Sequence, residues 1–407
     1  MPPATTFIES PQSRERAATV ARPALPPVII IGGNDNALSL ARGFGRRGID
    51  VYVVNQPNAD VAKSRFVKVV ELPDHPSFED AAADWLCGTN SDHLQQSVLL
   101  AASDEGLSIL AKYHELLSQR FLLDLCNPVA QLQMLDKLDT YLLARKAGVP
   151  TPKFWQVSTQ DDLAKLRDEL VYPIIVKPVL SHVFQQKFHT KFIVADNFEQ
   201  LAEAFGVAAD ANIDVLLVEK IPGPDTQLCS YYTWLDEYGN TAFDFTKRII
   251  RRYPVNMGLA TYHVTDHVEG VKEHAVKLFR HVELQGLANA EFKYDARDGV
   301  LKLIECNARF TAANGLVARA GIDLGALVYN RLTGLPLPPL DDFRDGLTLW
   351  DPMRDFKAFL ELRRSGELTL LDWLRSVSRW HCFPGFDLMD PRPGLVRLMR
   401  RLCKPGK

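Results

Sequence analysis

The sequence predicts an α/β domain, two mixed α+β lobes and a helical C-terminal extension, in that order. Two observations carry this prediction. An apolar strand at 27–33 ends in two glycines, and a helical pattern at 34–48 and a second apolar strand at 49–55 follow it. This βαβ unit implies a parallel sheet. Beyond residue 131, strand patterns follow one another without regular helical alternation, which is typical of partly antiparallel sheets.

The remaining elements are predicted from periodicity and from glycine or proline stops. A third strand of the first domain lies at 97–103. Further helices are expected at 131–148, 161–170, 269–282 and 314–334, and further strands at 172–179, 214–221, 229–237, 240–249, 286–295 and 302–310. With LPLPPL at 335–340 as a linker, the expected parts are a flexible tail (1–26), an α/β domain (27–130), a first lobe (131–218), a second lobe (219–335) and a helical extension (336–407).

Composition limits the class of protein. The formal net charge of −3 gives no overall attraction for nucleic acid, so a nucleic-acid partner is not expected. The six cysteines include no CxxC pair, which argues against a zinc ribbon or a disulfide framework and suits a reducing cytoplasm. No window has the roughly 18 apolar residues of a transmembrane segment. These features predict a cytoplasmic protein that acts on small molecules.

Polar residues stand at the carboxyl ends of two predicted strands in the first domain. Asn34 and Asp35 follow the first strand, and Asp104 and Glu105 follow the third. Ligands of open α/β sheets bind at this edge, but the same residue types also cap helices, and both interpretations stay open. The stretch GGNDNA does not match the GxGxxG dinucleotide fingerprint.

The chemistry is concentrated in the stretch KLIECNARF. Glu305, Asn307 and Arg309 alternate with apolar residues, so on a strand they share one face. Glu291 lies fourteen residues before Glu305, and the turn signal ARDG between them predicts a hairpin that sets the two acids side by side. Two opposed carboxylates and an amide oxygen suit Mg²⁺. A solvent-facing sheet surface is the alternative.

Further charged residues point to a phosphorylated ligand. Lys177 ends a strongly apolar strand, where an unpaired ammonium is costly, and a nucleotide phosphate is a suitable counter-ion. Glu219 and Asp225 flank a proline–glycine turn, where they could accept sugar hydroxyls or an exocyclic amine. The alternatives are an ordinary surface lysine and ordinary loop acids. The chain contains no GxSxG or HExxH motif of a hydrolase.

The order of these motifs resembles the ATP-grasp superfamily, and within it the carboxylate–amine ligase branch that includes D-aspartate ligase-like and carbamoyl-phosphate-synthase-like proteins. The resemblance covers residues 27–335. Its elements are Asp136-Lys137, Gly148-Val-Pro-Thr-Pro152, Val176-Lys177-Pro178, Val218-Glu219-Lys220 with Gly223 and Asp225, Glu291, and Glu305-Cys-Asn307-Ala-Arg309. It implies an ATP-grasp fold with an N-terminal Rossmann-like pre-grasp domain.

The resemblance also implies site roles and cofactors, namely ATP and Mg²⁺ or Mn²⁺. It implies that Lys137 and Lys177 bind the ATP phosphates, that the segment Glu219, Lys220 and Ile221 binds the adenine, and that Asp225 binds the ribose. It also implies that Glu291, Glu305 and Asn307 bind the metal and that Arg309 contacts the transferring phosphoryl group.

Two features near the expected reaction centre depart from the family pattern. Relatives carry an RK-x-R-Q-x-P segment where this chain has KRIIRRYP, so Arg248 and Arg251 are expected to clamp the carboxylate or acyl phosphate, while Ile249 replaces the lysine. By strand alternation Arg251 shares a face with Lys247. The usual glycine-rich phosphate lid is replaced by the glycine-free stretch 181–191.

The sequence therefore predicts an ATP- and Mg²⁺-dependent ligase that activates a carboxylate as an acyl phosphate and joins it to an amine. The resemblance also allows a homodimer. Two alternatives stay open: a bicarbonate-using carboxylase or carbamoyl-phosphate type, and a nucleotide-binding protein without turnover, which the glycine-free stretch favours.

Overall fold

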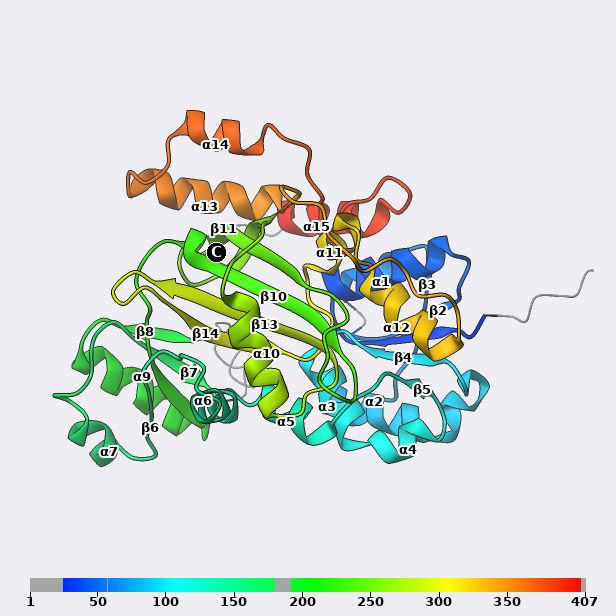
Figure 1. Cartoon of the computed structure of the whole chain (residues 1–407), viewed down its shortest axis with the longest axis horizontal. Helices are drawn as coiled ribbons and strands as arrows, with labels where there is room; N and C mark the ends of the chain where they lie inside the picture. Colours follow the sequence, from blue (N-terminus) through cyan, green and yellow to red (C-terminus); the bar gives the residue numbers. More distant parts are fainter. Residues whose placement is uncertain (1–24, 57, 180–191, 404–407) are drawn as a thin grey trace, which may run out of the picture.

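The computed structural model describes residues 25–56, 58–179 and 192–403. Three sheets organise the chain (Figure 1). The first is a five-stranded parallel sheet in the order β3 (Val67–Val69), β2 (Val51–Val54), β1 (Val28–Ile31), β4 (Val98–Ala101) and β5 (Leu122–Leu123). Its helices are α1 (Asp35–Arg46), α2 (Phe78–Cys87), α3 (Asp104–Lys112) and α4 (His114–Ser118), with 3₁₀ helices η1 (Asp60–Lys63) and η2 (Thr89–Leu94).

Glycines shape the loop that leaves β1. Gly32 and Gly33 have φ of +67° and +77°, and a Cβ on Gly33 would lie 2.4 Å from the carbonyl oxygen of Ala102. Only glycine fits such a close, left-handed approach. The loop therefore brings Asn34 and Asp35 next to the end of β4.

A small antiparallel sheet forms the first lobe, in the order β6 (Phe154–Gln156), β9 (Val215–Glu219), β7 (Ile174–Pro178) and β8 (Ile193–Ala195). Helices α5 (Pro128–Leu135), α6 (Lys137–Lys146), α7 (Gln160–Lys165) and α9 (Phe198–Asp210) accompany it. The single helix predicted at 131–148 was wrong. Asp136 has extended backbone angles and its carboxylate accepts from the amides of Leu138 and Asp139, so it starts a second helix.

The largest sheet has the order β14 (Val300–Asn307), β13 (Gly286–Asp295), β10 (Leu228–Leu235), β11 (Phe245–Tyr253), β12 (Leu259–Thr265) and β15 (Thr348–Trp350), and all its pairings are antiparallel. Helices α10 (Val271–His281), α11 (Asn314–Ala320) and α12 (Leu324–Thr333) pack around it, with the 3₁₀ helix η3 (Asp225–Gln227) at its edge. The one helix predicted at 314–334 is two, because Gly321 with φ +122° interrupts it.

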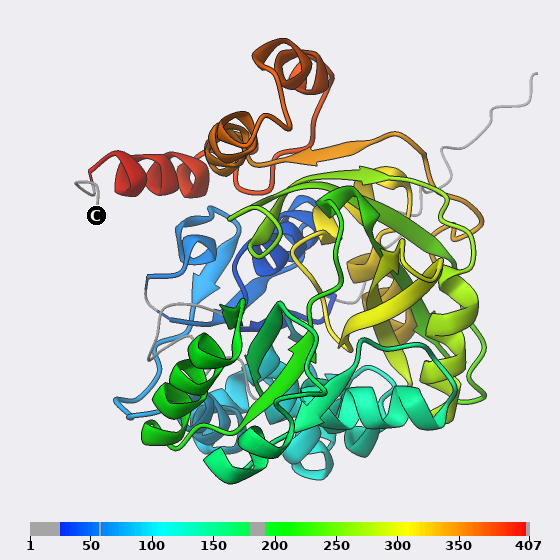
Figure 2. The same cartoon turned by 90° about the vertical axis from the view of Figure 1, so that its left-hand side faces the viewer.

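The chain after residue 336 contributes both a strand and helices. β15 extends the large sheet through β12. Helices α13 (Pro352–Arg364), α14 (Leu370–Val377) and α15 (Arg392–Leu402) lie over one side of the molecule, and α13 and α14 stand out from the body in Figures 1 and 2. No helix in the described ranges is long and apolar enough to cross a membrane.

The parallel sheet and the large sheet share one core. Val28 and Ile30 of β1 belong to the same buried cluster as Tyr232 and Phe245 of the large sheet. The predicted combination of a parallel α/β domain with mixed, partly antiparallel lobes is confirmed. The sequence did not indicate six of the strands. Five of them, β3, β5, β6, β8 and β15, are short, and the sixth, β12, has no clear alternation of apolar and polar residues before it.

Candidate active site

Four polar side chains form a row across the large sheet. Lys247 of β11 pairs with Ser230 of β10, Ser230 pairs with Glu291 of β13, and Glu291 pairs with Glu305 of β14. Directly opposed residues project from the same face. One face of the sheet therefore carries an ammonium group, a hydroxyl and two carboxylates in a line.

The predicted hairpin sets the two carboxylates side by side. The Glu291–Glu305 pairing is followed by a register shift between Glu291 and Phe292, because Leu303 and not Ile304 opposes Phe292. This bulge leaves the carbonyl of Ile304 free of the ladder at that point, and it accepts from Tyr141 Oη at 3.0 Å and from Lys177 Nζ at 3.2 Å. The sheet and the first lobe thus meet beside Glu305.

The buried Lys247 and the half-buried Lys177 lie near the carboxylate pair. Burial lowers the pKa of Lys177, and the nearby charges of Glu305 and Glu291 oppose that shift. Burial likewise lowers the pKa of Lys247, and Glu291 opposes it. Lys247 is 1% exposed and donates to Ser230 Oγ at 2.9 Å. Lysines that stay close to carboxylates in a buried place are well suited to bind phosphate oxygens.

Asn307 is oriented by a neighbour. Its Nδ2 donates to Asn289 Oδ1 at 3.1 Å, and Asn289 Nδ2 in turn donates to the carbonyl of Tyr231 at 3.0 Å. This chain fixes the amide of Asn307 so that its Oδ1 remains available as an acceptor.

The donor set fits a hard cation. Two carboxylates and one amide oxygen, with room left for water and phosphate oxygens, suit Mg²⁺ or Mn²⁺. Among the described residues, no three His, Cys, Asp or Glu side chains gather as a metal-binding group. A cation at Glu291, Glu305 and Asn307 would therefore complete its shell with non-protein ligands.

Arg309 connects this site to the α/β domain. Strand β14 ends at Asn307, so Arg309 lies in the following loop and not on the strand face that alternation predicts. Its Nε is 2.5 Å from Asp104 Oδ1 at the start of α3. Burial alone would lower the pKa of Arg309, but Asp104 and Glu305 outweigh it and the pKa is raised. Arg309 therefore stays charged near Glu305.

Lys137 and Asp104 belong to the same place. A small pocket is lined by Asp104, Lys137, Tyr141, Glu305 and Asn307, among others. Lys137 is the first residue of α6, a position set by the break at Asp136. The structure thus brings Lys137, Lys177, Glu291, Glu305, Asn307 and Arg309 together.

Helix capping does not explain the residues at the edge of the parallel sheet. Ser103, not Asp104, caps α3 by accepting from the amide of Gly106. Asn34 makes no side-chain cap for α1 and accepts from the amide of Asp60 at 3.1 Å, while Asp35 pairs with Arg397 of α15 at 2.5 Å.

The segment predicted to bind adenine and ribose is already engaged in protein contacts. Glu219 is 6% exposed and pairs with Arg297 at 2.7 Å. The amide of Lys220 donates to Pro173, and the carbonyl of Ile221 accepts from Lys293 Nζ at 3.1 Å. The carboxylate of Asp225 accepts hydrogen bonds from Arg252 Nε at 2.7 Å and from the backbone amides of Arg252 and Asn256. These contacts hold the segment in place, and the adenine and ribose roles stay predictions.

Arg251 and Arg248 do not join the row of site residues. The expected alternation was wrong at this point, since a bulge between Ile249 and Arg251 puts Arg251 on the face opposite Ile249. There its guanidinium binds both oxygens of Asp355 on α13, at 2.8 and 2.9 Å. Arg248 pairs with Asp266. Their roles as substrate clamps stay untested predictions.

Sequence reasoning missed three residues that the fold brings to the site: Lys247, Ser230 and Asn289. In the sequence, Lys247 stands out only as part of a basic stretch. Its site position follows from the pairing of β10 with both β11 and β13, which are distant in sequence. The predicted lid at 181–191 lies outside the described residues.

Comparisons with known proteins were made for sequence and for fold. No protein-family model matches the chain. It is similar to a D-aspartate ligase of Enterococcus faecium, with 22% identity over 362 residues that cover 83% of this chain and 85% of that protein. The L-amino acid ligase of Bacillus licheniformis shares the fold with a TM-score of 0.58 and 20% identity, covering 79% of this chain and 78% of that one.

The second similar structure is a complex with nucleotide. It is the biotin carboxylase domain dimer of Hydrogenobacter thermophilus 2-oxoglutarate carboxylase with MgADP, ADP and bicarbonate, with a TM-score of 0.61 and 16% identity over 80% of this chain and 73% of that one. These matches confirm the predicted relationship. The chain shares the ATP-grasp fold of these proteins, and its similarity to the D-aspartate ligase agrees with the predicted resemblance to the carboxylate–amine ligase branch.

Proposed function

We propose that the protein uses ATP and Mg²⁺ to activate a small carboxylic acid as an acyl phosphate and then joins it to an amine, releasing ADP and phosphate. The observation that carries the proposal is the opposed pair Glu291 and Glu305, with Asn307 beside it, on a sheet face bounded by Lys177 and Lys247. Acids for a metal and cations for phosphates in one place suit phosphoryl transfer, which depends on positioning and charge neutralisation.

In the first step, a carboxylate oxygen of the acid substrate attacks the γ-phosphorus while the bond to the β,γ-bridging oxygen breaks, and ADP leaves. Lys177 and Lys247 hold phosphate oxygens from opposite sides of the carboxylate pair. Arg309, kept charged by Asp104, offsets charge that develops on the transferred group. Glu291, Glu305 and Asn307 would hold Mg²⁺, which would supply further neutralisation of the phosphates.

In the second step, the amine nitrogen attacks the acyl carbon. The carbon–oxygen bond to phosphate breaks, inorganic phosphate leaves and the extra amine proton passes to solvent. The residues of the site favour this division of labour, because they include cations that can bind an acyl phosphate near Arg309, while no nucleophile is required of the protein.

The relatives suggest that an amino acid is one of the substrates. A D-aspartate ligase and an L-amino acid ligase are among them. The edge of the parallel sheet, at Asn34 and Asp104, is a suitable place for such a substrate because Asp104 already contacts Arg309. The Hydrogenobacter structure contains bicarbonate, so activation of bicarbonate is the second candidate.

Product analysis separates these candidates. The purified protein would receive Mg·ATP with pools of D- and L-amino acids, hydroxy acids and polyamines, and mass spectrometry would follow ADP and any condensed product. A new mass equal to acid plus amine minus water, formed with ADP, is the expected result. ADP formed with bicarbonate and without an amine would favour the carboxylase type. ATP binding without any ADP in all pools would contradict the ligase proposal.

A further inference from the structure

A cavity of 330 Å³ lies away from the row of site residues, between α1, the start of α11 and α12, and the C-terminal segment 382–387. This volume lies in the range of small-molecule sites. Small residues create the space, since Gly43, Gly315 and Ala318 line it where larger side chains would fill it. A Cβ added to Gly43 would have nothing within 4 Å.

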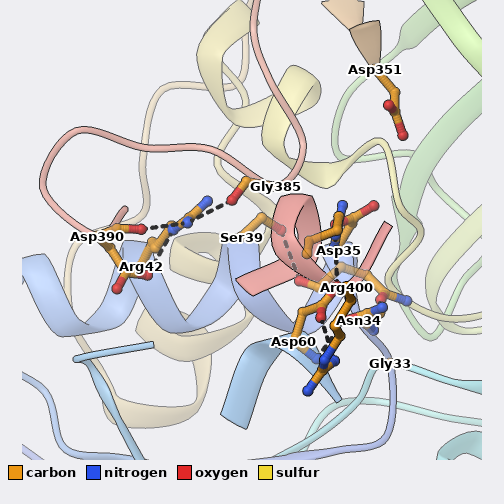
Figure 3. Close-up of polar contacts among 12 residues, drawn as sticks. Gly33, Asn34, Asp35, Ser39, Arg42, Asp60, Asp351, Gly385, Asp390 and Arg400 are labelled. Carbon is orange, nitrogen blue, oxygen red and sulfur yellow. Dashed lines mark hydrogen bonds and ion pairs between the residues drawn. The ribbon is translucent and has the colours of Figure 1, made fainter. Parts of the chain in front are cut away.

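The C-terminal segment is held over the cavity by buried contacts. Arg42 of α1 donates to Asp390 at 3.0 Å and to the carbonyl of Gly385 at 3.1 Å, and Figure 3 shows both contacts. Ser64 Oγ also donates to Asp390, at 2.8 Å. Because Arg42 and Asp390 are almost fully buried, this anchor makes the wall a fixed part of the fold.

Among the described residues, the cavity lining holds four arginines, of which Arg42 is bound to Asp390, and three aspartates, Asp35, Asp323 and Asp387. Arg46 and Arg319 lie 2.5 and 3.8 Å from the same carboxylate, Asp387. The guanidinium of Arg47 donates to the neutral amide oxygen of Asn330 at 2.7 Å and lies over the ring of Tyr329. Their guanidinium groups stay partly exposed, so an anion can reach them from solvent.

Asn314 is part of the cavity wall. It is 5% exposed, and in the described part of the chain its Nδ2 has no partner and is out of reach of solvent. A buried amide without a partner costs free energy, and a ligand acceptor would remove that cost once the side chain turned toward the cavity. Asn314 Oδ1 accepts from the amide of Thr311, in the loop that carries Arg309. An occupant of the cavity would therefore touch the same loop as the candidate active site.

We propose that this cavity binds a small organic or inorganic anion whose carboxylate or phosphate group lies between Arg46, Arg47 and Arg319 and whose body reaches toward Asn314. This site goes beyond the proposed ligase activity and does not depend on it. Arg–carboxylate and Arg–phosphate contacts give the affinity, and the cavity volume limits the ligand to a small molecule.

The test is calorimetric titration of the full-length protein with succinate and, separately, with inorganic phosphate. The variants are Gly43→Leu, which fills the cavity, and Arg319→Gln, which removes a cation at its mouth. Gly206→Leu makes the same change in α9, far from the cavity, and Lys177→Met removes a cation from the candidate nucleotide site. Circular dichroism confirms that each variant is folded.

At least one of the two anions is expected to bind the wild type, and its dissociation constant is expected to rise tenfold or more in both cavity variants. In the two control variants it should change by less than about twofold. Comparison of the two anions shows whether carboxylate or phosphate is preferred. Absence of binding by both anions, or binding that either cavity variant leaves unchanged, or binding that Lys177→Met abolishes, would overturn the proposal.

Discussion

The ion pair between Arg251 and Asp355 should be essential for docking the C-terminal extension. The Asp355 side chain is fully buried and accepts from Arg251 twice, from Thr261 Oγ1 at 2.9 Å and from Trp373 Nε1 at 2.9 Å. Asp355→Ala leaves a guanidinium that is only 4% exposed without its counter-ion. Breaking a buried pair in this way costs about 3–5 kcal/mol.

Urea unfolding followed by tryptophan fluorescence measures this loss, because Trp373 stacks on Phe359 with ring centroids 4.9 Å apart and reports on α13 and α14. Asp341→Ala, an exposed aspartate in the same extension, is the matched control and should change stability by less than about 0.5 kcal/mol. A loss below about 1 kcal/mol for Asp355→Ala would refute the reasoning.

A double variant separates structure from catalysis at Arg251. Arg251→Met with Asp355→Leu replaces the pair by apolar groups of similar size, which is often neutral for stability. If Arg251 is structural, this variant recovers most of the stability and keeps ATP turnover within about threefold. If stability recovers while turnover falls by orders of magnitude, Arg251 contacts the substrate and the geometric interpretation is wrong.

Three further predictions concern the candidate active site and Lys293, which contacts the segment predicted to bind adenine. Lys247→Met should lower ADP formation by about 100-fold or more, since a buried phosphate-binding cation is lost, while the exposed Lys272→Met should change it less than twofold; equal rates in the two variants would remove Lys247 from the site. Asn289→Ala should raise the Mg²⁺ concentration for half-maximal rate about tenfold, since Asn307 loses its orienting partner, and an unchanged Mg²⁺ titration would argue against that role. Burial, and after it the charge of Arg252, lowers the pKa of Lys293 from 10.5 to about 8. As pH rises, the folded state therefore loses this proton before the unfolded state does, and the stability of the wild type should increase relative to Lys293→Met between about pH 8 and about pH 10.5. Denaturation curves in which the two proteins show the same pH dependence would contradict this.

The sequence was sufficient where the signals are local. The apolar strands with their glycine stops indicate the parallel sheet, and the ARDG turn indicates the hairpin that carries Glu291 and Glu305. The register of the turn alone would oppose Glu291 to Ile304, and only the bulge beside Phe292 places Glu305 opposite Glu291. The local sequence also identifies Lys177 as a candidate phosphate-binding residue, since an ammonium group at the end of an apolar strand needs a counter-ion.

The rest depends on tertiary pairing that no local pattern encodes. The bulge near Ile250 reverses the direction of Arg251, and its partner Asp355 is 104 positions further along the chain. Lys247 reaches the carboxylates only because β10 lies between β11 and β13. The helical periodicity places Asp136 inside a helix, whereas in the structure its backbone is extended and it caps the N-terminus of α6.

The most direct test of the central claim is ADP formation by Glu305→Gln under the conditions that support wild-type turnover. The substitution keeps the shape of the side chain and removes one charge from the carboxylate pair, while Glu237→Gln makes the same change at an exposed position. We predict a loss of about 100-fold or more for Glu305→Gln and less than twofold for Glu237→Gln. Turnover by Glu305→Gln within about twofold of wild type would contradict the assignment of this sheet face as the active site.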